Sequence, residues 1–165
     1  MESKRCFLIG HRSVPESIRT HLCNAIKQHI AAYGIEEFYV GRYGQFDRIA
    51  RQALIAAKTI FPHIRLYLLT PYHPSERSIS LPAGFDGSHY PFERVIPRRV
   101  AIVAANRAMV DSCDFLITYA RYPGNARENL YYAQNRARKN SLHILNLADF
   151  IENTAQYCDS SKQGL

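Results

Sequence analysis

The sequence lacks the patterns that mark membrane proteins, low-complexity chains and disulfide-rich proteins. It has no apolar run approaching the roughly 18 residues of a membrane helix, and no signal-peptide pattern follows Met1. Eight glycines and eight prolines are too few for a low-complexity or collagen-like chain of 165 residues. The four cysteines are widely spaced and indicate neither a disulfide framework nor a metal site. We therefore expect a soluble, cytoplasmic globular protein without a membrane partner or a metal.

Lysine is also scarce, whereas arginine is abundant. The chain has 16 arginines and 5 lysines against 14 acidic residues, which gives a formal net charge of +7. Arginine offers a planar set of donors that suits phosphate and carboxylate groups. The charge alone is equally compatible with a basic soluble surface, a nucleic-acid-binding face and a pocket for a phosphorylated small molecule.

Short apolar runs alternate along the chain with segments of helical periodicity. The runs predict strands at residues 4–10, 37–41, 64–70, 114–120 and 142–147. The periodic segments predict helices at 15–34, 46–61, 98–113 and 126–139, with a short one at 149–156. This alternation predicts an α/β fold: a single three-layer domain with a mainly parallel five-stranded sheet in the order 3-2-1-4-5.

The stretch 71–97 has no periodicity and contains five prolines. Long irregular connections inside a compact domain are usually functional, so we expect this loop to be a lid. We assign residues 1–156 to one domain and residues 157–165 to a flexible polar tail.

Three glycine-containing turns follow predicted strands, at residues 10–13, 41–47 and 121–126. Parallel strands bring such turns to one edge of the sheet, and ligands bind there at the point where the winding reverses. Glycine allows a ligand to approach the backbone, and the free N–H groups at a helix start bind anions. Any one of these glycines could simply make a tight turn, but three turns together with nearby arginines favour an anionic ligand. The arginines are Arg12, Arg42, Arg121 and Arg127.

Familiar nucleotide signatures are missing from these turns. None of them matches GxGxxG or GxxxxGK[ST], so the sequence indicates neither a conventional dinucleotide site nor a P-loop. We accordingly predict no cofactor.

Four longer motifs carry a resemblance to a known family. They are CFLIGHR at 6–12, FYVGRYGQFDRIA at 38–50, NRAMVDSCDFLITY at 106–119 and GNARENLYYA at 124–133, continued by ILNL at 144–147. In order and spacing they resemble the YpsA-like branch of the SLOG superfamily, across residues 5–147 except the long loop. The resemblance implies a Rossmann-like fold and a pocket for nucleotides or nucleotide-derived ligands. Relatives include nucleotide-signal sensors of bacterial defence systems and phosphoribohydrolases that release cytokinin bases.

The family motifs and the glycine turns together define the predicted ligand-binding residues. These are Gly10, His11, Arg12, Gly41, Arg42, Gly44, Phe46, Asp47, Asn106, Arg107, Gly124, Asn125 and Ala126. Three positions depart from the family pattern: Arg42 and Asn125 replace glycines, and Ala105 stands where many relatives carry an arginine. Binding tolerates these departures more easily than catalysis does.

The leading hypothesis is therefore binding of a nucleotide or nucleotide-derived ligand that bears phosphate. The alternative is an N-glycosidic hydrolase of nucleoside monophosphates, a phosphoribohydrolase, with Glu128 and Asp47 as catalytic candidates. A second alternative, suggested by the net charge, is a nucleic-acid-binding accessory protein. Asp47 could equally cap its helix, and His11 could equally make a structural hydrogen bond. The sequence leaves the identity of the ligand, catalysis and the oligomeric state open.

Overall fold

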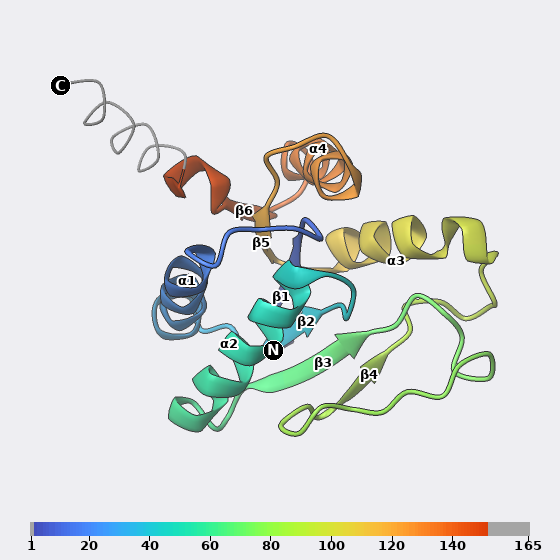
Figure 1. Ribbon diagram of the computed structural model, residues 1–165, viewed down its shortest axis with the longest axis horizontal. Coiled ribbons are helices and arrows are strands. Elements are labelled where there is room, and N and C mark those ends of the chain that lie inside the picture. Colours follow the sequence, from blue (N-terminus) through green and yellow to red (C-terminus); the bar gives the residue numbers. More distant parts are fainter. Residues whose placement is uncertain (1, 152–165) are drawn as a thin grey trace, which may run out of the picture.

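A six-stranded parallel sheet forms the centre of the protein in a computed structural model, which describes residues 2–151 (Figure 1). The strands, in chain order, are β1 (Arg5–Gly10), β2 (Glu37–Val40), β3 (Arg65–Leu69), β4 (Gly87–His89), β5 (Phe115–Tyr119) and β6 (His143–Asn146). Their order across the sheet is β4-β3-β2-β1-β5-β6, and every neighbouring pair is parallel. The winding therefore reverses at β1, between β2 and β5.

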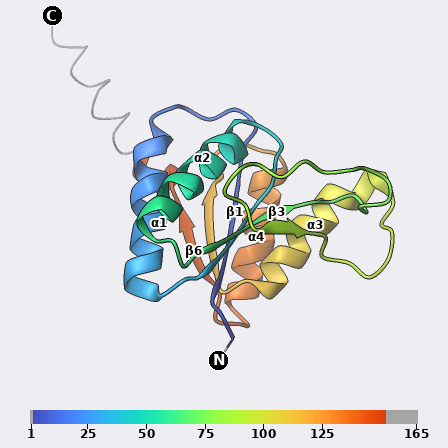
Figure 2. The same ribbon diagram turned by 90° about the horizontal axis from the view of Figure 1, so that it is seen from below.

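Four helices cover the two faces of the sheet. They are α1 (Ile18–Tyr33), α2 (Gln45–Ile60), α3 (Arg98–Ser112) and α4 (Asn125–Ala137). Figure 2 shows α1 and α2 together on one side of the sheet and α3 and α4 on the other, which gives three layers. Among the described residues, no helix has both the length and the apolar character needed to cross a membrane.

Two apolar clusters hold these layers together because successive strand residues face opposite sides of the sheet. Leu8 and Ile117 belong to the cluster under α1 and α2, whereas the preceding residues Phe7 and Leu116 belong to the cluster under α3 and α4. All four side chains are buried. Burial on both faces explains why the strands are continuous apolar runs in the sequence.

The predicted α/β class is confirmed. The predicted order 3-2-1-4-5 corresponds to β3-β2-β1-β5-β6 in the structure. The helix predicted from residue 15 starts at Ile18, because Pro15–Ser17 form a turn in which the Ile18 N–H donates to the Pro15 carbonyl at 3.1 Å.

The sequence prediction missed β4, which lies inside the stretch 71–97. Its residues pair with β3, and the Thr70 N–H donates to the His89 carbonyl at 2.9 Å. The preceding Asp86 anchors it, because its carboxylate accepts the Leu66 N–H at 2.8 Å and binds Lys58 Nζ at 2.5 Å. Polar contacts rather than an apolar pattern thus build this edge strand.

Most of the predicted C-terminal features lie outside the described residues. Residues 148–151 are helical, and the rest of the helix predicted at 149–156 is not described. The tail at 157–165 and the division into domain and tail stay predictions.

Candidate functional site

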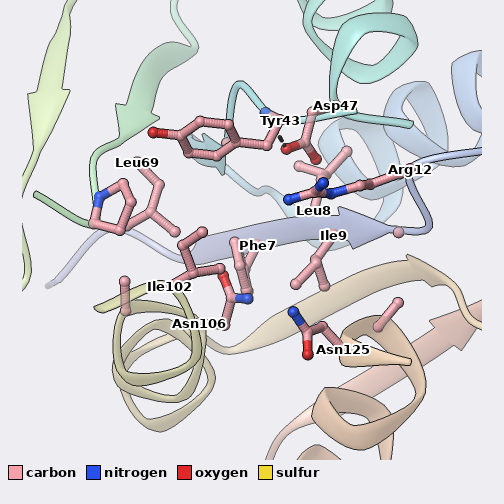
Figure 3. A pocket seen from close by; sticks show the side chains of 15 residues that line it. Phe7, Leu8, Ile9, Arg12, Tyr43, Asp47, Leu69, Ile102, Asn106 and Asn125 are labelled. Carbon is pink, nitrogen blue, oxygen red and sulfur yellow. Dashed lines mark hydrogen bonds between the residues drawn. The ribbon is translucent and has the colours of Figure 1, made fainter. Parts of the chain in front are cut away.

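A cleft of about 80 Å³ lies at the carboxyl ends of β1 and β2, where the winding of the sheet reverses (Figure 3). Its lining residues are Phe7, Leu8, Ile9, Gly10, Arg12, Gly41, Tyr43, Asp47, Leu69, Pro71, Ile102, Ala105, Asn106, Asn125 and Ala126. In Figure 3 the Arg12 side chain extends over β1, with Asp47 on one side and Asn125 on the other. A typical small-molecule pocket measures roughly 300 Å³ or more, so this cleft accommodates part of a nucleotide in the conformation described.

The first turn starts at Gly10, which packs directly on the ring of Phe46. A Cβ on Gly10 would overlap the ring and lie 2.9 Å from Phe46 Cβ. Phe46 is fully buried in the core, so it supports the turn from below instead of lining the cleft. The resulting close approach of β1 and α2 requires glycine at this strand end.

The second turn is built around the carboxylate of Asp47. Its Oδ2 accepts the Tyr43 N–H at 3.0 Å, and a Cβ on Gly41 would lie 2.7 Å from the same oxygen. Asp47 is 7% exposed, and this burial raises its pKa to about 7, although the Tyr43 N–H and the charge of Arg51 act in the opposite direction. Asp47 is therefore partly protonated at neutral pH while it lines the cleft.

Gly44 joins the second turn to the first. Its φ of +91° lies in the region that favours glycine, and a Cβ there would lie 2.7 Å from Arg12 Cα. The next N–H, of Gln45, donates to the Arg12 carbonyl at 2.9 Å. The start of α2 thus holds the backbone of Arg12 in place, and its side chain lines the cleft.

His11 ties the first turn to the third. Its Nε2 accepts the N–H groups of Arg121 and Tyr122, at 2.8 and 3.0 Å. Burial lowers the pKa of His11 from 6.5, which favours the neutral ring that these two bonds require. The side chain therefore organises the turns without being part of the cleft lining.

The third turn leads into α4 through Gly124. Its φ of +146° favours glycine, and no side chain caps the helix. The first N–H groups of any α-helix have no partner within the helix, and the helix dipole makes that end attractive to anions. Asn125 and Ala126, the first residues of α4, line the cleft.

Two of the predicted arginines point elsewhere. The Arg107 guanidinium lies over the Tyr132 ring, 5.1 Å from its centre, and lines a smaller space between α3 and α4. Arg42 lies 5.6 Å from the centre of the Tyr43 ring and lines a different small pocket. Asn106, the residue before Arg107, does line the cleft.

The structure therefore brings seven predicted residues into the cleft lining: Gly10, Arg12, Gly41, Asp47, Asn106, Asn125 and Ala126. Four others, His11, Gly44, Phe46 and Gly124, shape the turns around it. The two catalytic candidates are separated, because Asp47 lines the cleft and Glu128 lines the space between α3 and α4. The functional roles of all these residues stay predictions.

Sequence reasoning missed Asn129, whose polar side chain is buried between α3 and α4. A signal was present: Asn129 lies three residues after Ala126 and four before Ala133, on the inner face of α4. A polar residue at an apolar position of the helix is the pattern that could have revealed it.

The arrangement of possible metal ligands and the state of two cysteine thiols can be described for residues 2–151. Across residues 2–151, no group of three His, Cys, Asp or Glu side chains is placed to hold a metal ion. Burial raises the pKa of the Cys113 thiol to about 12 and also raises that of Cys6, which keeps both thiols protonated.

Comparisons of sequence identify no relatives: no protein-family model matches the chain, and no curated protein matches it. Solved structures do match. DNA processing protein A from Helicobacter pylori, described for its mode of binding single-stranded DNA, aligns with a TM-score of 0.58 and 17% identity over 93% of this chain and 73% of that one. The molybdenum cofactor binding protein from Rippkaea orientalis aligns with a TM-score of 0.59 and 15% identity, over 94% and 85%.

DNA processing protein A from Streptococcus pneumoniae gives a TM-score of 0.59 and 14% identity, covering 82% of this chain and 48% of that chain. These matches show that this chain has a Rossmann-like fold. At these identities the likeness shows the fold alone, and the chain spans about half the length of the Streptococcus protein.

Proposed function

We propose that the cleft binds the phosphate of a nucleotide or nucleotide-derived ligand, and that the chain is a SLOG-type domain of the YpsA-like branch. The observation that carries the proposal is the convergence of Arg12 and the starts of α2 and α4 on one cleft. Neither helix has a side-chain cap at its first turn. The first N–H of α2, from Gln45, already donates to the Arg12 carbonyl. A ligand phosphate supplies acceptors for the remaining N–H groups at these two helix starts.

The charges around the cleft support an anionic ligand. Arg12 contributes a full positive charge, and each helix start contributes a partial one. Among the described residues that line the cleft, Asp47 is the one acidic side chain, and its raised pKa leaves it partly neutral at pH 7. Repulsion of a phosphate by this carboxyl is correspondingly reduced.

The opposite wall offers groups for the rest of the ligand. Asn106 from α3 and Asn125 from α4 present amide donors and acceptors, and Ile9 and Ile102 add apolar surface. A small number of polar groups on apolar walls is the usual composition of a ligand pocket. The phosphate would occupy the cleft, while the nucleoside would extend beyond it.

A thermal-shift series tests this proposal. The native protein is heated with inorganic phosphate, ribose 5-phosphate, AMP, GMP and adenosine, each at the same concentration. Ligands that bind only the folded state raise its melting temperature. We expect stabilisation by the phosphate-bearing compounds and none by adenosine. Stabilisation by adenosine alone, or by no compound, would count against a phosphate site.

One feature favours hydrolysis of an N-glycosidic bond as a second candidate function. A carboxyl group with a pKa near the working pH suits general acid–base catalysis, and Asp47 in the cleft has this property. Its bond from the Tyr43 N–H holds one oxygen in place. Incubation with nucleoside monophosphates and chromatography of the released base tests this candidate. Release that Asp47→Asn abolishes would support it, and no release from any of the four common monophosphates would eliminate it.

Nucleic-acid binding is a third candidate, because arginines lie over exposed tyrosines in the third turn and on α4. Arg121 lies 5.5 Å from the centre of the Tyr122 ring, and Arg127 lies 5.6 Å from that of Tyr131. Aromatic rings combined with arginines bind single strands by stacking and charge. A DNA-binding protein shares the fold. The affinity for an oligothymidylate should then fall steeply with salt, and no binding at low salt would eliminate this candidate.

A further inference from the structure

Beside the cleft, α3 and α4 enclose a second space of about 20 Å³, which we call the crevice. Its lining residues are Val103, Asn106, Arg107, Asn125, Glu128 and Asn129. Asn106 and Asn125 line both the cleft and the crevice. The crevice therefore adjoins the cleft along the wall that Asn106 and Asn125 form.

Asn129 is the unusual member of this lining. Its side chain is buried, with 5% of the residue exposed, and neither the amide nitrogen nor the amide oxygen has a hydrogen-bond partner among the described residues. Buried polar groups in folded proteins are almost always paired, because an unpaired donor or acceptor loses its bonds to water. An apolar side chain on this inner face of α4 would carry no such cost. The amide thus calls for a partner that the chain itself does not provide.

The chemistry of the amide defines that partner. A primary amide presents a donor and an acceptor side by side in one plane. Its complement is a planar group with an adjacent acceptor and donor, and asparagine pairs in this bidentate way with N6 and N7 of adenine. Phosphate and ribose carry no such planar pair. A nucleobase edge therefore satisfies both atoms of Asn129 in one plane, whereas ribose offers only separate hydroxyl groups and phosphate offers no donor when ionised.

We propose that Asn129 binds the base edge of the nucleotide whose phosphate lies in the cleft. The inference rests on the function proposed above and adds recognition of the base to it. The ring would lie along the wall that Asn106 and Asn125 share with the cleft. Both amide atoms of Asn129 are closed to solvent in the conformation described, so α3 and α4 must separate for a base edge to enter the crevice. Its volume also suits one buried water molecule, which would make Asn129 a structural residue and contradict the proposal.

Calorimetric titration with AMP and with ribose 5-phosphate distinguishes base binding by Asn129 from a purely structural role of this residue. Asn129→Leu removes the donor and the acceptor and keeps the number and branching of the side-chain heavy atoms. We expect its affinity for AMP to fall about tenfold or more, the loss of one bidentate pair, with the affinity for ribose 5-phosphate unchanged. Asn135→Leu is the matched control, because Asn135 lies on the exposed part of the same helix, and it should alter neither affinity.

The melting temperature of the ligand-free variants gives an independent readout. Replacing an unpaired buried amide with leucine should leave the melting temperature of Asn129→Leu equal to or above that of the native protein. A lower melting temperature together with an unchanged affinity for AMP would show that a bound water or the fold uses this amide, and would overturn the proposal.

The native protein provides a test that depends on no variant. In a nitrogen–proton NMR spectrum, AMP should shift the side-chain amide signal of Asn129, and ribose 5-phosphate should leave it in place. An unmoved signal with saturating AMP would overturn the inference and leave the phosphate site standing. If neither compound binds the native protein, both the phosphate site and the base-edge inference are wrong.

Discussion

The imidazole Nε2 of His11 accepts the backbone N–H of Tyr122 at 3.0 Å. This bond, with a second one from the Arg121 N–H at 2.8 Å, fixes the turn before α4 against the end of β1. The cleft has three positively charged features, which are Arg12 and the starts of α2 and α4. The position of the α4 start depends on His11, whose side chain lies outside the cleft lining. His11 thus acts as a positioning residue in this account.

His11→Ala should loosen the third turn. Both N–H groups lose their acceptor, so amide hydrogen exchange at Arg121 and Tyr122 should accelerate by about tenfold or more, as expected for a lost bond of about 1.5 kcal/mol. NMR-detected exchange measures this residue by residue. His21→Ala, an exposed position on α1, is the control and should leave both rates unchanged. Equal exchange in the native protein and His11→Ala would contradict the positioning role.

Asp47 should make the stability of the protein depend on pH. Because its folded pKa of about 7 lies above the ordinary aspartate value of 3.8, the unfolded chain loses this proton first as the pH rises. The contribution of Asp47 to the free energy of unfolding therefore declines between about pH 4 and pH 7, by at most about 4 kcal/mol. Above that range it is constant.

Asp47→Asn tests this behaviour because asparagine cannot ionise, yet still accepts the Tyr43 N–H. We expect similar melting temperatures for the native protein and the variant near pH 4, and a variant that is more stable by about 5 °C or more at pH 8. Circular dichroism melts at several pH values give the comparison. A difference that does not change with pH would mean that Asp47 ionises in its ordinary range.

Gly10→Ala should destabilise the fold, because its Cβ would overlap the buried ring of Phe46. Forcing extra volume into a packed core costs about 1–3 kcal/mol, which lowers the melting temperature by several degrees. Gly87→Ala serves as the control, since its Cβ would lie at an ordinary 3.6 Å from the Tyr67 ring. Equal melting temperatures for the two variants would show that Phe46 moves aside freely.

The fold was largely predictable because its central strands are buried on both faces. Apolar runs such as 37–41 and 114–120 show that burial directly in the sequence, and α2 between them has a clear helical period of buried residues. Strand β4 was not predictable in the same way. Gly87, Ser88 and His89 have no apolar pattern, and the strand forms because Asp86 and the edge of β3 hold it.

The candidate site was predictable only in part, for a comparable reason. Glycines at the predicted strand ends indicated turns at Gly10 and Gly41, and the structure packs both closely against α2. Their role in ligand binding stays a prediction. Asn106 lines the cleft, whereas Arg107 lies over the Tyr132 ring. Which of the two faces the cleft depends on the rotation of α3 about its axis, and the weak apolar pattern of α3 does not define that rotation. The partners of His11 come from residues 110 and 111 positions away, and a contact over that distance exists only in the folded chain.

Equilibrium binding of AMP to Arg12→Gln tests the phosphate site most directly. Arg138→Gln is the matched control, because it removes the same charge at the exposed end of α4, away from the cleft lining. We predict that Arg12→Gln binds AMP about tenfold or more weakly than the native protein, a loss expected for one charge-assisted contact, while Arg138→Gln binds it normally. Equal affinities in all three proteins, or a loss of the same size in both variants, would contradict a phosphate site in the cleft.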